Sequence, residues 1–87
     1  MKRNPDFLLR DVAGTFVVVP VGAATAAFTG MISLNGTGAF LWEQLEQEQT
    51  AQSLAEALTR EYEVDMDQAV ADVQRFLNRL MPTGAIV

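Results

Sequence analysis

The first third of the chain groups its apolar residues in the way that β-strands do. Residues 7–12 and 15–19 are rich in β-branched and aromatic side chains, which predicts two strands. Between them, Ala13-Gly14 is a two-residue hairpin signal, and Pro20 ends the second strand. Residues 23–26 are less informative and predict either a loop or a short helical turn.

The third predicted strand, residues 28–34, alternates between two faces. One face carries Phe28, Gly30, Ile32 and Leu34, and the other carries Thr29, Met31 and Ser33. This alternation predicts one face buried against a core and one face in water. The strand contains no proline and no charged residue.

Three helices are predicted after residue 34, each beginning at a capping residue. Asn35 and Thr50 are the expected N-caps of the first two, and Asp65 with Gln68 has the spacing of a capping box for the third. Pro82 ends the third helix. Its apolar stripe consists of Ala69, Val70, Val73, Phe76, Leu77, Leu80 and Met81.

Three strands followed by three helices predict an α+β domain, in which the helices cover one face of a three-stranded antiparallel sheet. With 87 residues the chain has length for one core, so residues 1–87 are expected to form a single domain. Hydrophobic residues make up 49% and charged residues 20%, which is typical of a globular protein rather than a disordered one.

Composition and charge exclude several function classes. The chain has no cysteine and no histidine, which excludes disulfides, thiolate nucleophiles, Cys/His zinc sites and histidine acid–base catalysis. Residues 1–34 sum to +1 and residues 35–87 to −6, for a net charge of −5, and an acidic half repels nucleic-acid phosphates. No signal-peptide core is seen, and no apolar run reaches the roughly 18 residues of a membrane helix, so a cytoplasmic domain without membrane contact is expected.

The junction of the third strand and the first helix is the most specific part of the sequence. Residues 34–45, LNGTGAFLWEQL, resemble the Leu-Asn-x-Thr-Gly-x3-Trp-x-x-Leu segment of the PqqD family. The resemblance continues through Thr50, Leu54, Tyr62-Glu63-Val64-Asp65, Asp72-Val73 and Phe76-Leu77, and so covers essentially the whole chain. The connection 22–27 and Gly36 depart from common members, so the resemblance does not identify the peptide or require pyrroloquinoline quinone (PQQ) biosynthesis.

The resemblance implies a winged-helix-like fold and a non-catalytic role without a cofactor. PqqD-like domains are recognition elements for ribosomally made peptides that are modified after translation. The implied ligand is the leader segment of a precursor peptide, added as a further strand beside the third strand and packed against the third helix. The implied partner is a tailoring enzyme, often a radical S-adenosylmethionine (SAM) enzyme, to which the peptide is presented.

The candidate peptide-binding residues lie on the third strand and on the third helix. Strand addition needs free main-chain N–H and C=O groups, which the third strand offers if it forms a sheet edge. The strand candidates are Phe28, Thr29, Gly30, Met31, Ile32, Ser33 and Leu34, and the helix candidates are Val70, Val73, Gln74 and Leu77. The competing interpretation is structural: uncharged strands are usually buried, Val73 and Trp42 are expected in the core, and Asn35 and Thr37 are expected to cap a helix.

Other functions are less well supported. The acidic residues Glu61, Glu63, Asp65 and Asp67 lack the spacing of a calcium loop, so no metal site is predicted. The alternative function is a winged-helix DNA-binding regulator, but the would-be recognition helix carries aspartates near its start, where groove reading needs basic and amide groups. A free strand edge also predicts a homodimer formed by edge pairing.

Overall fold

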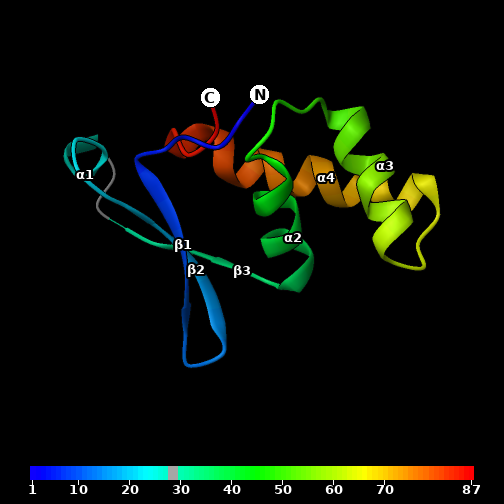
Figure 1. The fold of residues 1–87 in the computed structure, drawn as a ribbon, viewed down its shortest axis with the longest axis horizontal. Coiled ribbons are helices and arrows are strands. Elements are labelled where there is room, and N and C mark those ends of the chain that lie inside the picture. The colour runs from blue at the N-terminus through cyan, green and yellow to red at the C-terminus, as the bar shows by residue number, and fades with distance from the viewer. Residues whose placement is uncertain (28–29) are drawn as a thin grey trace.

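A three-stranded antiparallel sheet lies beside three helices in the computed structural model, which describes residues 1–27 and 30–87 (Figure 1). The strands are β1 (Phe7–Val12), β2 (Thr15–Pro20) and β3 (Ile32–Leu34), with a short helix α1 (Ala24–Ala27) between the second and third. The later helices are α2 (Gly36–Gln44), α3 (Ala51–Glu61) and α4 (Met66–Leu80), followed by a 3-10 turn, η1 (Met81–Thr83). The predicted α+β order is confirmed, and α1 shows that the connection after β2 is a helical turn.

The hairpin of β1 and β2 is built on the predicted Ala13-Gly14 turn. Both residues have positive φ, 54° and 84°, as a type I′ turn requires. Asp11 supports the turn because its Oδ1 accepts a hydrogen bond from the Gly14 N–H at 3.0 Å. The hairpin projects beyond the helices like a wing (Figure 1), in agreement with the expected winged-helix-like architecture.

The strand predicted over residues 28–34 is shorter in the structure, where β3 comprises only Ile32–Leu34. Gly30 and Met31 precede the strand, and Phe28 and Thr29 lie outside the described residues. The prediction of seven strand residues was therefore wrong at Gly30 and Met31.

Pro20 explains why the ladder between β2 and β3 is short. Val18 lies opposite Ile32, so the same register two residues further along would place Pro20 opposite Gly30. Proline has no main-chain N–H to donate to that pair. The ladder therefore stops at Ile32.

The three predicted N-caps are formed. Asn35 Oδ1 accepts from the Gly38 N–H at 2.8 Å, Thr50 Oγ1 from the Ser53 N–H at 3.0 Å, and Asp65 Oδ1 from the Gln68 N–H at 2.8 Å. The capping box predicted for Asp65 and Gln68 is only half formed, because the Gln68 side chain donates to Asp72 at 2.9 Å instead. The complete capping box belongs to Thr50 and Ser53.

The chain ends are tied to each other, which the sequence pattern did not predict. After the 3-10 turn, Gly84 adopts a left-handed conformation with φ of 85° and redirects the chain. The Lys2 N–H donates to Val87 O at 2.7 Å, and the Val87 N–H donates to Lys2 O at 2.8 Å. The next residues inward, Arg3 and Ile86, form an antiparallel bridge, so the two ends of the chain lie side by side (Figure 1).

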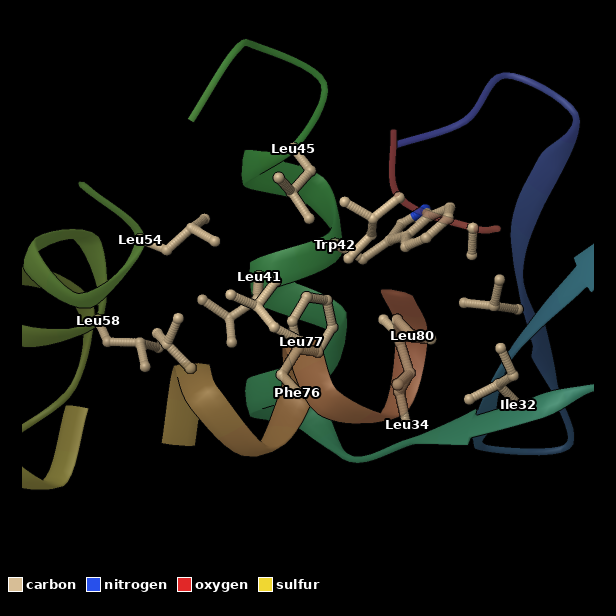
Figure 2. Close-up of a cluster of buried hydrophobic side chains, with 14 of the residues drawn as sticks. Ile32, Leu34, Leu41, Trp42, Leu45, Leu54, Leu58, Phe76, Leu77 and Leu80 are labelled. Carbon is tan, nitrogen blue, oxygen red and sulfur yellow. The ribbon is translucent and has the colours of Figure 1, made fainter. Parts of the chain in front are cut away.

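One hydrophobic core joins the inner face of the sheet to α2, α3 and α4 (Figure 2). Trp42 is 1% exposed and Val73 is 2% exposed, and Phe76 and Leu80 are also buried, so their predicted place in the core is confirmed. The most fully buried side chains are Trp42, Leu41, Leu45, Leu54, Leu58, Leu80, Val18 and Val73. The helices therefore cover one face of the sheet.

Candidate functional site

The strand β3 lies at an edge of the sheet. The strand order is β1-β2-β3, so β3 pairs with β2 and has no second strand beside it among the described residues. An edge strand presents main-chain groups that another extended chain can pair with. The edge position that strand addition requires is therefore present.

The pairing register determines which main-chain groups of β3 are free. Val12 and Thr15 flank the two-residue turn and form a hydrogen-bonded pair, and such pairs alternate along an antiparallel ladder. Val17, two residues after Thr15, therefore turns its N–H and C=O toward β1 and away from β3. Ser33 lies opposite Val17, so its own N–H and C=O point out of the sheet at the edge.

A side chain from α4 reaches this edge. Arg79 Nη2 donates a hydrogen bond to Ser33 O at 2.8 Å, which joins residues 46 positions apart. The contact identifies the margin of α4 that faces β3. Because an α-helix turns about 100° per residue, Asp72 and Arg75 lie on the same margin as Arg79.

A pocket of about 160 Å³ lies between this margin, the end of β3 and the start of α2. Its lining residues are Leu34, Asn35, Thr37, Gly38, Leu41, Asp72, Arg75, Phe76 and Arg79. The apolar members Leu34, Leu41 and Phe76 belong to the buried core. A cavity of about 150 Å³ accepts benzene, so this pocket has room for one medium-sized side chain.

Gly38 lets the start of α2 approach β3 closely beside this pocket. A Cβ atom at this position would lie 3.2 Å from the Cβ of Leu34, which is closer than ordinary van der Waals contact. The Asn35 cap holds the same turn, because its Oδ1 accepts from the Gly38 N–H. The Asn-x-Thr-Gly segment therefore shapes one wall of the pocket, although Asn35 also has the capping role that the sequence predicted.

Of the two arginines at the pocket, only Arg75 is paired with a carboxylate. Arg75 donates to Asp72 Oδ1 at 2.8 Å, and the Gln68 amide donates to the same oxygen at 2.9 Å. Arg79 forms no ion pair with any carboxylate in the described part of the chain. One positive charge is therefore left uncompensated at the β3 edge of an otherwise acidic domain.

The candidates on the third strand occupy different environments. Ile32 and Leu34 are buried and extend from β3 toward the helices (Figure 2), whereas Ser33 is exposed. Gly30 and Met31 are also exposed, and Met31 keeps 66% of its surface in water. The predicted alternation between buried and exposed faces is confirmed from Met31 to Leu34. The candidates Phe28 and Thr29 lie outside the described residues.

The candidates on the third helix do not line the pocket. Val73 and Leu77 are buried in the core, with 2% and 5% of their surfaces exposed. Val70 and Gln74 are exposed. Nine residues at about 100° each place Val70 on the opposite side of α4 from Arg79, and Gln74 is only slightly closer. Peptide contact by these four residues remains a prediction without support from the pocket.

Sequence reasoning missed the polar residues of the pocket. Asp72, Arg75 and Arg79 form a charged margin at spacings of three, four and seven residues along α4, a pattern usually shown by a solvated helix face. The apolar stripe of α4 has a second border, which carries Val70 and Gln74. The helix pattern alone does not show which border meets β3, and the hydrogen bond from Arg79 to Ser33 O identifies it.

The acidic turn before α4 shows no metal site. Among the described residues, no group of three or more acidic side chains is arranged to hold a metal ion. The Asp65 carboxylate in this turn serves as the N-cap of α4. In the same described part, none of the helices combines the length and apolar character needed to cross a bilayer.

Comparison with known proteins gives one family and two similar structures. Residues 15–86 match the model of the family described as coenzyme PQQ synthesis protein D (PqqD). The structure of TbiB1 in complex with the TbiA(beta) leader peptide is similar, with a TM-score of 0.74 and 20% identity, over 98% of this chain and 93% of that one. No curated protein matches the sequence.

The second similar structure is lasso peptide synthetase B1 complexed with the leader peptide. Its TM-score is 0.70 at 22% identity, and the match covers 95% of this chain and 92% of that chain. At this level of identity, both likenesses show that the fold is shared.

Proposed function

The chain belongs to the PqqD family, and from that premise we propose that it is a non-catalytic peptide-binding domain. Its ligand is the leader segment of a ribosomally made precursor peptide. The domain binds the leader by strand addition at β3 and presents the peptide to a separate tailoring enzyme. Both similar structures were solved with a leader peptide bound, which supports this choice of ligand.

The observation that carries the proposal is the edge position of β3 beside a pocket. Ser33 turns an N–H and a C=O out of the sheet, and an extended peptide can pair with both groups. Successive side chains of an added strand point to opposite faces, so alternate peptide residues face α4 and the pocket. Main-chain pairing supplies affinity with little sequence preference, and the pocket supplies specificity.

The proposed contact surface combines the edge with the pocket. The main chain from Gly30 to Leu34 runs beside the peptide, and Ser33 lies at the centre of the paired segment. Asn35, Thr37 and Arg79 form part of the polar rim of the pocket. Ile32 and Leu34 contribute main-chain groups and pocket walls, since their side chains pack into the core.

The composition supports binding rather than catalysis. Without cysteine or histidine, the chain has neither a thiolate nucleophile nor an imidazole base, so chemistry on the peptide is assigned to the partner. A radical SAM enzyme is the partner that the family resemblance favours, and another tailoring enzyme fits the same role. A second copy of the chain would use the same edge, so homodimerisation would compete with the peptide.

DNA binding is the weaker proposal. The start of α4 carries Asp65 and Asp67, and Asp72 follows one turn later, in a chain of net charge −5. Duplex DNA presents phosphates, which basic residues must neutralise. No arrangement of the described residues favours that function over peptide binding.

Titration of the isotope-labelled domain with short precursor peptides encoded beside its gene tests the proposal. Amide NMR signals of Ile32–Leu34 are expected to shift, because the peptide adds to their edge. Signals of residues at the pocket, such as Thr37 and Arg79, are expected to shift with them. If none of these peptides shifts the β3 signals, the proposed function is refuted. Sedimentation during the titration shows whether the edge instead pairs with a second copy.

A further inference from the structure

Arg79 is the arginine at this edge that has no carboxylate partner among the described residues. A guanidinium has five N–H donors, and the structure gives Arg79 one hydrogen bond, to Ser33 O at 2.8 Å. Arg75, four residues earlier on the same margin, is instead paired with Asp72 at 2.8 Å. Arg79 therefore has donors available for a further partner beside the proposed peptide site.

A docking peptide meets Arg79 directly. Ser33 offers one N–H and one C=O at the free edge, and Arg79 already donates to the C=O. In an antiparallel ladder, a peptide residue that pairs with Ser33 requires both groups. The guanidinium must then share or release Ser33 O, and a peptide carboxylate is the acceptor that matches its planar set of donors best.

The alternation of side chains along a strand determines which peptide residue can carry that carboxylate. The Ser33 side chain points away from the helices, between the buried side chains of Ile32 and Leu34. The peptide residue directly opposite Ser33 points to the same outer face, while the residues before and after it point toward α4. One of these two neighbours lies on the side of the strand from which Arg79 approaches.

We propose that Arg79 is a specificity-determining residue that selects an acidic side chain in the peptide. The acidic residue lies one position from the peptide residue that pairs with Ser33. In the free domain, Arg79 covers the carbonyl that the peptide will use, and in the complex it turns to the carboxylate. This inference rests on the proposed function. The net charge of −5 on the chain disfavours acidic peptides elsewhere, so the unpaired Arg79 also determines register.

Selection from a library of short random displayed peptides tests this inference without knowledge of the natural ligand. The baits are the wild-type domain, Arg79→Gln, Arg79→Glu and the control Arg60→Glu. Arg60 is an exposed arginine in the last turn of α3 and does not line the pocket, so its variant has the same charge change as Arg79→Glu.

Peptides that bind the wild type and shift the β3 amide signals are expected to share Asp or Glu at one position. The Arg60→Glu variant retains this preference, Arg79→Gln loses it, and Arg79→Glu selects Lys or Arg there. A merely structural role for Arg79 would not reverse the selected charge. For one synthetic wild-type binder, replacing the shared acid by its amide weakens binding to the wild type about fivefold and leaves binding to Arg79→Gln unchanged.

The outcomes separate the two proposals. If no selected peptide shifts the signals of Ile32–Leu34, strand addition itself fails. If peptides bind at that edge without an acidic preference, or with a preference that Arg79→Glu leaves intact, only the role of Arg79 is overturned. If Arg79→Glu does not fold, Arg79→Gln decides the question. Loss of the acidic preference in that variant supports the role of Arg79, and an unchanged preference overturns it.

Discussion

Replacement of Ser33 by proline removes the outward N–H at the centre of β3 and leaves the rest of the edge in place. The register assigns the inward hydrogen bonds of β3 to Ile32 and Leu34, so the ladder to β2 does not use the Ser33 N–H. Proline is tolerated on edge strands when its missing N–H would face solvent. It restricts the preceding Ile32 to extended conformations, which that residue already adopts.

The expected loss in peptide affinity follows from one missing hydrogen bond. A hydrogen bond contributes about 0.5–1.5 kcal/mol net, and a buried acceptor left without a partner costs about 1–3 kcal/mol. The proline ring also occupies the space through which the peptide approaches. Ser33→Pro should therefore weaken leader binding by about 1–3 kcal/mol, which is about 5- to 150-fold in Kd. Its free energy of unfolding should change by less than about 1 kcal/mol.

Calorimetric titration with a peptide that shifts the β3 signals measures the effect, and Ser33→Ala is the matched control. The alanine variant keeps the main-chain N–H and loses only an exposed hydroxyl, so it should bind like the wild type. Urea unfolding of both variants verifies that the domain remains folded. Equal affinity of the folded proline variant and the wild type would refute main-chain pairing at Ser33, whatever else the peptide contacts.

Three further predictions test local features of the structure. Ala13→Asn should raise the free energy of unfolding by about 0.5–1 kcal/mol, because asparagine adopts the left-handed conformation at lower cost; no gain in urea unfolding would contradict this. Asp65→Ala should lower the free energy of unfolding by about 1 kcal/mol, whereas Gln68→Ala should change it by at most about 0.5 kcal/mol, because only the Asp65 half of the capping box is formed. Equal losses in the two variants would contradict a half-formed capping box. Val70→Ser should leave peptide affinity within about twofold, whereas Thr37→Trp, which fills the pocket, should weaken it about tenfold; the opposite order in calorimetric titration would place the peptide on the other margin of α4.

Features that depend on residues close together in the chain could be predicted from the sequence. The Ala13-Gly14 turn and the caps at Asn35, Thr50 and Asp65 were predicted correctly, because each is decided by atoms within a few residues. Local reading failed at Gln68 because two partners lie within reach of its side chain. In a capping box its oxygen would accept from the Asp65 N–H, whereas in the structure its amide donates to the Asp72 carboxylate. Spacing alone does not choose between them.

The candidate site could be predicted only in part from the sequence. Sequence pattern and family resemblance directed attention to the third strand, and its edge position agrees with that expectation. The margin of α4 was not predictable, because helix periodicity shows which side of α4 is apolar but not which border of that side meets the sheet. Val70 and Gln74 lie on one border and Arg79 lies on the other, and the packing of α4 against the sheet brings Arg79 to Ser33.

By itself, the sequence determined the strands of the hairpin, the starts of the three later helices and most of the buried side of α4. These follow from the alternation and capping preferences of short segments, which act wherever the segment lies. Only the tertiary structure decided that β3 begins as late as Ile32, that Lys2 pairs with Val87, and that Arg79 covers Ser33 O. Such contacts join residues far apart in the chain, and the packing of the whole core selects among many partners that are locally equivalent.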